Sequence, residues 1–218
     1  MRQQLDAIYR AMAAHYGPTH WWPGETPFEI AVGAILTQNT AWTNVEKAIA
    51  NLKRAHLLQP ARMWQAPDDV LEQAVRPSGY FRQKSKRLKI FCHHLLRHYG
   101  GSIKRMAKRP MTTLRPELLA LHGIGPETAD DILLYACEKP VFVVDAYTKR
   151  MLARHGLIDD AAGYDVVQAL FHDHLGRDVA LFKEYHGLIV YIGKDFCRRQ
   201  PRCDACPLRV FLHRAGPG

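Results

Sequence analysis

The nine residues LHGIGPETA, at positions 121–129, constrain the fold of this chain more than any other stretch. A glycine-x-glycine-proline pattern that begins at Gly123 predicts a tight turn between two helices. We expect Pro116 to open one helix that Gly123 closes, and a second helix to run from Pro126 to about Cys137. Backbone N–H groups at the start of the second helix can point at a phosphate group. The alternative is a glycine-capped helical hairpin that only packs.

The rest of the chain carries the signals of helices and lacks those of sheets. Thr26-Pro27-Phe28-Glu29 is a capping-box sequence that precedes an apolar series with helical spacing. Period-2 alternation flanked by hairpin turns is missing, and the run VFVV at 141–144 is too short and isolated to found a sheet. One further helix is expected to begin at Trp42, and a short one after Pro67, with caps from Asp68 and Asp69. A basic helix should end at Tyr99, and another should run from Asp145 to Gly156. The last two are expected at 165–175 and 179–192. The fold should be all-α.

The charge balance favours a polyanionic partner. The 218 residues include 30 Lys and Arg against 21 Asp and Glu, a formal charge of +9, and binding to a polyanion would release counterions. Basic residues cluster at 81–89, 102–110 and 196–202, although each cluster taken singly is as consistent with a solvated helix face. The sequence has no run of about 18 apolar residues and no h-region at its amino terminus. We expect a cytoplasmic protein with no membrane partner.

The five cysteines fall into two groups. Cys92 and Cys137 lie in apolar helical patterns and are expected in the core. Cys197, Cys203 and Cys206 fall within ten residues near the end of the chain. An odd number of cysteines in a cytoplasmic chain argues against a disulfide framework.

Several motifs follow one another in a characteristic order. LTQNT at 36–40 precedes LHGIGPETADDILLYA at 121–136, and VDAYTKRM at 144–151 precedes HGLIVYIGKDFCRRQPRCDACP at 186–207. Together they resemble the helix-hairpin-helix/Gly-Pro-Asp superfamily of DNA glycosylases, to which endonuclease III belongs, over about 25–207. Within it, WWPGETPFEIAVGAILTQNTAW at 21–42 is most similar to the Helicobacter-type 3-methyladenine DNA glycosylases.

The resemblance implies two helical lobes. The first comprises 23–139 and contains the helix-hairpin-helix at about 115–137; the second comprises 1–22 plus 140–218 and contains the cysteine-rich loop at 197–206. A cleft between the lobes would bind the DNA and the damaged base, with Asp145 on one side and tryptophans on the other. We expect a monomer that acts on double-stranded DNA containing damaged bases, in the cytoplasm at the nucleoid.

Asp145 is the candidate catalytic residue. Cleavage of an N-glycosidic bond leaves positive charge on the sugar, which a nearby carboxylate can stabilise while it orients or deprotonates a water. Aspartate is also among the commonest helix N-caps, a role that contributes about 1 kcal/mol. One residue can do both, and the resemblance places Asp145 at the family's catalytic position.

Glu127 stands where endonuclease III-like bifunctional enzymes carry a lysine that forms a Schiff base with the sugar. A carboxylate cannot form an imine, so AP lyase activity is not expected. The plain alternative is an acid favoured in the first turn of a helix. Further DNA contacts are expected from Gln38, which would fill the hole left by the flipped base, from Tyr80 on a second wedge loop, and from the hairpin residues Gly123, Gly125, Glu127 and Thr128.

The resemblance also implies a base pocket. It would be formed by Trp21, Trp22, Pro23 and Trp42, with Lys194 where the Helicobacter-type enzyme is thought to have a modified lysine. Indole faces attract a cationic base by roughly 0.5–2 kcal/mol per contact, and alkylation at N3 or N7 makes a purine cationic. The alternative is that adjacent tryptophans before a helix form a hydrophobic plug.

The terminal cysteines depart from the family pattern. Endonuclease III-like proteins hold a 4Fe-4S cluster with cysteines spaced C-x6-C-x2-C-x5-C. Here Cys197, Cys203 and Cys206 are spaced C-x5-C-x2-C, and Leu212 takes the fourth position, with His213 next to it as a substitute ligand. The possibilities are a cluster with three cysteines and one histidine, a zinc site with the same ligands, and a remnant without metal.

We therefore expect a monofunctional DNA glycosylase of base excision repair that excises N3-alkylated purines. One alternative is an endonuclease III-like glycosylase/AP lyase for oxidised or mismatched bases. Another is a non-catalytic helix-hairpin-helix protein that uses the hairpin only to bind DNA.

Overall fold

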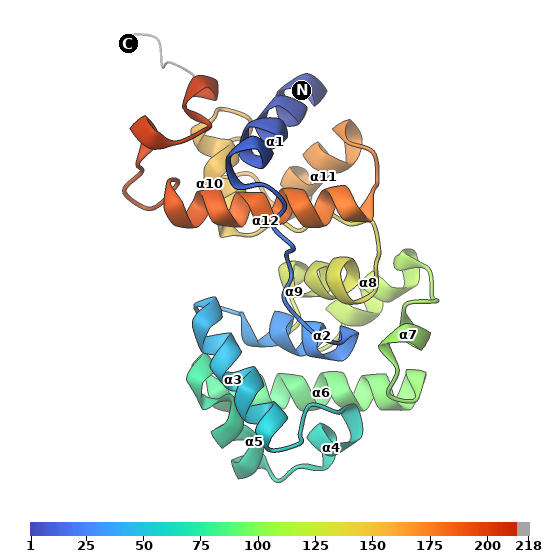
Figure 1. The fold of residues 1–218 in the computed structure, drawn as a ribbon. Coiled ribbons are helices and arrows are strands. Elements are labelled where there is room, and N and C mark those ends of the chain that lie inside the picture. The colour runs from blue at the N-terminus through green and yellow to red at the C-terminus, as the bar shows by residue number, and fades with distance from the viewer. Residues whose placement is uncertain (213–218) are drawn as a thin grey trace. The chain divides into compact units, whose positions relative to one another are not determined.

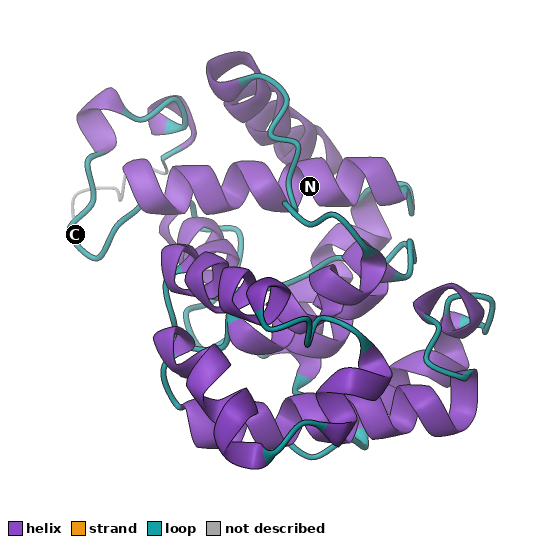
Figure 2. Cartoon of the chain, turned by 60° about the horizontal axis from the view of Figure 1, so that its bottom comes forward, coloured by secondary structure: helices purple, strands orange, loops and turns teal. Residues whose placement is uncertain are grey.

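The computed structural model describes residues 1–212, and within that range it consists of helices joined by loops (Figures 1 and 2). No strand occurs among these residues, so the all-α prediction is confirmed. The chain divides into two compact units. The continuous unit is Pro23–Lys139, and the split unit combines Met1–Trp22 with the chain from Pro140 onward.

The continuous unit contains eight α-helices and a π-helical segment among its described residues. They are α2 (Pro27–Leu36), α3 (Trp42–Arg54), α4 (Pro60–Gln65), α5 (Asp68–Val75), α6 (Phe81–Tyr99), α7 (Ile103–Met106), α8 (Met111–Leu119), α9 (Pro126–Asp131) and the π-helical segment Ile132–Ala136. Helix α2 lies at the centre, in contact with α3, α6, α9 and the π-helical segment. Its sequence PFEIAVGAIL is apolar almost all round, as expected of a helix covered on every side.

The start of α2 shows half of the predicted capping box. The Thr26 side chain accepts a hydrogen bond from the Glu29 backbone N–H at 3.1 Å, and Pro27 occupies the first helical position. The Glu29 carboxylate pairs instead with Lys53 of α3 at 3.0 Å. This arrangement ties the first turn of α2 to the neighbouring helix.

One predicted helix start is wrong, and one predicted pair of caps occupies the first helical turn instead. Pro116 lies inside α8, which begins at Met111 behind Pro110 and ends at Leu119; an internal proline removes one helical hydrogen bond, and α8 continues past that loss. Asp68 and Asp69 occupy the first turn of α5 behind the N-cap Pro67. Acids favour the first turn through the helix dipole as well as through capping, so the sequence pattern is similar for both.

The helix predicted from Pro126 to about Cys137 has the right extent but two geometries. It is α-helical through Asp131 and π-helical from Ile132 to Ala136. All five residues of the π-helical segment are buried, and the segment packs on α2. The hairpin's second helix is thereby fixed in the core of the continuous unit.

The split unit brings the two ends of the described chain together. Its helices are α1 (Arg2–Tyr16), α10 (Ala146–Arg154), α11 (Tyr164–His174) and α12 (Val179–Asp195), followed by single 3-10 turns at Cys203–Ala205 and Arg209–Phe211. Helix α12 contacts α1 and α10, and Tyr185 on α12 donates a hydrogen bond to the Leu5 carbonyl at 2.9 Å. The segment VFVV is not a strand but a buried extended link that leads into α10.

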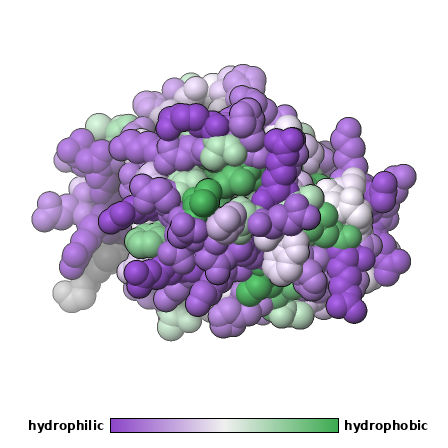
Figure 3. All heavy atoms as spheres, turned by 90° about the horizontal axis from the view of Figure 1, so that it is seen from below, coloured by the Kyte–Doolittle hydropathy of each residue, from purple (hydrophilic) through white to green (hydrophobic). Residues whose placement is uncertain are grey.

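One face of the molecule is mainly polar (Figure 3). The face in Figure 3 is mostly hydrophilic, with a few separate apolar patches. None of the helices in residues 1–212 combines the length and hydrophobicity that a membrane span requires.

Candidate functional site

Asp145 caps α10 with one carboxylate oxygen and faces a histidine with the other. Its Oδ1 accepts hydrogen bonds from the backbone N–H and the hydroxyl of Thr148, both at 2.7 Å. Its Oδ2 lies 3.7 Å from Nε2 of His186 on α12. The His186 side chain is buried, and the Asp145 side chain keeps 12% of its surface exposed. The predicted N-cap is confirmed, and the cap leaves Oδ2 for other interactions.

The surroundings of Asp145 keep it ionised. Burial, the largest single influence, raises the pKa of the carboxyl group because a charge is poorly solvated there. The nearby imidazole of His186 and the two hydrogen bonds from Thr148 act the other way, and together they hold the pKa below its ordinary value of 3.8. The site therefore contains an anion at neutral pH.

Helix α12 positions this pair with one of its faces. His186 and Gly193 are seven residues apart, two helical turns, and both face α10. A Cβ atom at Gly193 would lie 2.2 Å from Cδ1 of Tyr147, which is why glycine stands there. The close approach at Gly193 and the histidine at 186 fix α12 against the beginning of α10.

The adjoining face of α12 holds Trp21. A Cβ atom at Gly187 would lie 2.6 Å from the Cβ of Trp21, and the rings of Tyr191 and Trp21 are 6.1 Å apart. Nζ of Lys194 lies 5.2 Å from the centre of the Trp21 ring. Trp22 follows, with its ring 5.7 Å from that of Trp21. The structure thus brings three of the predicted pocket residues, Trp21, Trp22 and Lys194, together in the split unit.

The other two predicted pocket residues belong to the continuous unit. Pro23 and Trp42 line a hollow of about 350 Å³ beside Glu25, Glu29, Glu46 and Lys53. The Trp42 indole N–H donates a hydrogen bond to Glu46 at 3.0 Å. Three carboxylates and one ammonium group thus surround this hollow, which makes it an acidic feature in a basic protein.

The helix-hairpin-helix turn has the predicted backbone. Gly123 has φ +85°, and a Cβ there would lie 2.4–2.6 Å from the Arg87 side chain. Gly125 is the N-cap of α9, and no described atom lies within 4 Å of a Cβ built at that position. Glu127 in the first turn is exposed, whereas Thr128 is buried. Gly123 is required by its positive φ and by the close approach of Arg87, whereas Gly125 borders open space at the start of α9.

Gln38 is held by the hairpin. Its amide nitrogen donates hydrogen bonds to the Gly123 carbonyl at 3.0 Å and to the Thr128 hydroxyl at 2.9 Å. Its amide oxygen accepts a hydrogen bond from Arg87 of α6. In this structure the predicted wedge residue is therefore hydrogen-bonded to the predicted phosphate-binding turn.

Lys84 links the two loops that carry the predicted wedge residues. Its buried ammonium group donates to the Leu36 carbonyl at 2.8 Å, two residues before Gln38, and to the Ser78 carbonyl at 2.6 Å, two residues before Tyr80. Burial, with a smaller repulsion from Arg87, lowers the pKa of Lys84 to about 8. Tyr80 itself is 61% exposed and has φ +44°.

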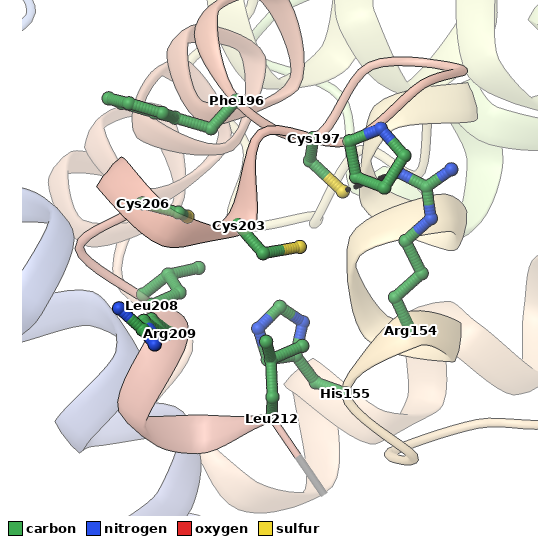
Figure 4. Close-up of a pocket in the computed structure, with 10 residues that line it drawn as sticks. Arg154, His155, Phe196, Cys197, Cys203, Cys206, Leu208, Arg209 and Leu212 are labelled. Atoms are coloured by element: carbon green, nitrogen blue, oxygen red, sulfur yellow. Dashed lines mark hydrogen bonds between the residues drawn. The ribbon is translucent and has the colours of Figure 1, made fainter. Parts of the chain in front are cut away.

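The three clustered cysteines line one cavity of the split unit, shown in Figure 4. Cys197 is buried and Cys203 and Cys206 are half-buried. Burial raises the pKa of the Cys206 thiol, and its neighbours Cys197 and Cys203 raise it further. His213 lies outside the described residues. No three His, Cys, Asp or Glu side chains within residues 1–212 are placed to hold a single metal ion.

The fold and the hairpin define a DNA glycosylase of the helix-hairpin-helix class. The chain belongs to the HhH-GPD superfamily of base excision DNA repair proteins, whose family model matches residues 32–176. It is accordingly a DNA glycosylase of base excision repair.

Individual relatives agree with this assignment. A Methanocaldococcus jannaschii protein that is named as a DNA repair glycosylase is 47% identical over 211 residues. The matched residues cover 96% of this chain and 96% of the relative. Endonuclease III of Thermotoga maritima is 29% identical and covers 88% of this chain and 86% of its own.

Solved structures share the fold. The H. pylori 3-methyladenine DNA glycosylase bound to 1,N6-ethenoadenine has a TM-score of 0.77 and 30% identity, covering 88% of this chain and 97% of its own. A trapped endonuclease III–DNA covalent intermediate has a TM-score of 0.83 at 23% identity, covering 98% and 96%.

Two residues of the site escaped the sequence analysis, His186 and Lys84. Each acts through a partner far away in the sequence, Asp145 in one case and the Leu36 carbonyl in the other. His186-Gly187 and Gly193-Lys194 repeat after seven residues, which is two helical turns. This repeat could have indicated a helix that packs against other segments through two neighbouring faces. Lys84 looks like one member of a basic run and carries no comparable signal.

Proposed function

We propose that the protein is a monofunctional DNA glycosylase that excises N3-alkylated purines from double-stranded DNA, with Asp145 as its catalytic carboxylate. One observation carries this proposal. The Asp145 carboxylate is ionised and held by the helix cap through Oδ1, while Oδ2 faces His186 at 3.7 Å. A fixed anion of this kind suits a reaction whose transition state is cationic.

The proposed role of Asp145 follows from where positive charge develops during the reaction. As the bond between sugar and base breaks, positive charge develops on the sugar, and a carboxylate already in place stabilises it without having to reorganise. The cap hydrogen bonds from Thr148 fix the carboxylate, and His186 offsets the cost of burying it. The same carboxylate can orient or deprotonate the water that attacks the sugar.

The absence of a hairpin lysine supports hydrolysis by water alone. Glu127 takes the position expected for the amine nucleophile of a lyase, and its exposed carboxylate cannot form an imine. Lys84, in the same unit, is buried with both observed hydrogen bonds directed at backbone carbonyls. Neither residue is suited to attack a sugar.

The preference for a cationic base is supported by the hollow beside Trp42. Its indole N–H is bonded to Glu46, so the carboxylate adds negative charge beside the indole ring. A cationic ring is attracted by both the indole face and that charge. Trp21 is different, because a lysine already lies over its ring. The similarity to the H. pylori 3-methyladenine glycosylase is consistent with this preference.

DNA contacts are assigned to the open hairpin and to the wedge loops. The α9 start at Gly125 would bind a backbone phosphate. Gln38 and the exposed Tyr80 would enter the duplex when the base leaves it.

Single-turnover excision with Asp145→Asn tests the proposal. Asn retains a side-chain oxygen that can cap α10 but removes the charge, so the excision rate on duplex DNA with 3-methyladenine should fall by at least about 100-fold, the scale of one preorganised electrostatic contact. Thermal unfolding and DNA affinity are measured in parallel to show that the fold persists. Near-normal excision by the folded variant would contradict the mechanism.

A further inference from the structure

The cavity between the three cysteines also contains a histidine. His155 follows the last residue of α10, and its side chain lines the same cavity as Cys197, Cys203 and Cys206. Figure 4 shows its ring within the space that the cysteine loop encloses, facing Cys203. The cavity has a volume of about 20 Å³.

The hydrogen bonding of His155 leaves one ring nitrogen ready to bind a ligand. Nδ1 lies 2.7 Å from the Met151 carbonyl, which can only accept, so Nδ1 carries the proton. In the neutral ring, Nε2 therefore has a lone pair. His155 is 4% exposed, and Nε2 has no hydrogen-bond partner among the residues that the structure describes. Metal-binding histidines commonly show this arrangement, with one N–H donated to a backbone carbonyl and the other nitrogen on the metal.

We propose that His155 Nε2 is the fourth ligand of an iron–sulfur cluster held by Cys197, Cys203 and Cys206. Three thiols and one imidazole are all soft or borderline ligands, and they surround a common space. The residue at the sequence position of a fourth cysteine, Leu212, lines the cavity with an apolar side chain. A buried imidazole reaching in from α10 supplies the ligand that the loop lacks.

The spread of the ligands favours a cluster over a single ion. A lone zinc requires four donors that converge at about 2.0–2.3 Å. The described residues contain no such convergent group, but the three cysteines and His155 are distributed around a void. A polynuclear cluster fills space and accepts one ligand at each corner. When bound, it would fix the loop without taking part in excision.

Arg154 connects the cavity to the basic loop that follows Cys197. Its guanidinium donates a hydrogen bond to the Cys197 sulfur at 3.4 Å and others to the carbonyls of Arg198 at 2.6 Å and Arg199 at 3.1 Å. Adjacent residues of α10 would thus hold the cluster and the loop backbone, and loss of His155 should also loosen the loop.

The test compares the wild-type chain with His155→Cys, His155→Ala and His213→Ala, all purified without oxygen. Wild type should contain about four iron and four sulfide per chain and absorb broadly in the visible range. Pulsed EPR of the paramagnetic cluster should show nitrogen coupling from a directly bound imidazole. That coupling should persist in His213→Ala and vanish in His155→Cys, which keeps its iron through the new thiolate. His155→Ala should lose at least half of its iron.

Three results would overturn the proposal. The first is nitrogen coupling that survives in His155→Cys or disappears in His213→Ala. The second is wild-type protein that contains no iron after reconstitution with iron and sulfide. The third is one equivalent of tightly bound zinc in place of iron. His155→Cys keeps the test decisive if His155→Ala does not fold, because it restores a metal ligand at the same position.

Discussion

Nε2 of His186 lies 3.7 Å from Oδ2 of Asp145. Burial and His186 shift the pKa of this carboxyl group in opposite directions. Burial alone would raise the pKa of Asp145, and His186 is the first influence that lowers it. The lowered pKa means that the stability contributed by ionised Asp145 is complete above pH 3.8 and is lost as the pH falls through the folded value. Activity that depends on the carboxylate should follow the same direction.

Replacing His186 should therefore move the acidic limb of the pH–rate profile upward. In His186→Ala only the hydrogen bonds from Thr148 still offset the burial of Asp145, so we expect the limb to move to higher pH in single-turnover excision. His186→Gln, which keeps an N–H donor, should shift it less, and His98→Ala on α6 should not shift it. An unchanged limb in His186→Ala would exclude His186 as the group that controls this carboxylate.

Borohydride trapping should distinguish hydrolysis from lyase chemistry. Wild-type protein incubated with lesion DNA and borohydride should form no covalent adduct, and its abasic product should break only in alkali, because Glu127 supplies no amine. Endonuclease III serves as the positive control for trapping. Glu127→Lys, which places an amine in the hairpin, should gain a detectable adduct. An adduct with the wild-type chain would show that another lysine acts as the nucleophile.

Glu46 should favour cationic bases. Glu46→Gln keeps an oxygen that can accept from the Trp42 indole N–H but removes the charge. We expect excision of 3-methyladenine to fall about fivefold, or ~1 kcal/mol, while excision of any neutral base that the enzyme accepts stays the same. Glu72→Gln, outside the hollow, is the control. An equal loss on both kinds of base would indicate a structural role for Glu46.

Lys84 should stabilise the continuous unit. Lys84→Met removes both hydrogen bonds and leaves the carbonyls of Leu36 and Ser78 buried without that donor, so the free energy of unfolding should fall by about 2–4 kcal/mol. Lys86→Met, exposed on the same helix, should stay within about 0.5 kcal/mol. Urea unfolding measures both. Equal stability of the two variants would contradict this prediction. It would mean that the free energy gained by no longer burying an ammonium group equals the free energy lost with the two hydrogen bonds.

Local signals predicted the fold well. Thr26 and Asp145 mark helix starts, because caps are set by residues within one turn of each other. The same locality explains the failure at Pro116, where tertiary packing keeps α8 intact on both sides of the proline. The π-helical segment also had no signal, since its five residues read as an ordinary buried helix.

The site was less predictable than the fold. Asp145 could be chosen because it combines a cap position with a family motif, whereas its partner His186 lies 41 positions later and meets it only in three dimensions. His155 looks in sequence like a cationic residue near a helix C-terminus, a common and uninformative pattern. Its significance depends on a cavity formed by cysteines more than forty residues away.

On the proposed function, the three hydrogen bonds of Gln38 would oppose its insertion into DNA. If Gln38 fills the space of the departing base, it must first leave the Gly123 carbonyl, the Thr128 hydroxyl and Arg87, at a cost of about 1 kcal/mol each. An intact, well-stacked duplex adds the cost of unstacking a base, and a damaged pair adds less. On the proposed function, the hairpin would therefore bind sound DNA while the Gln38 side chain stays hydrogen-bonded within the protein.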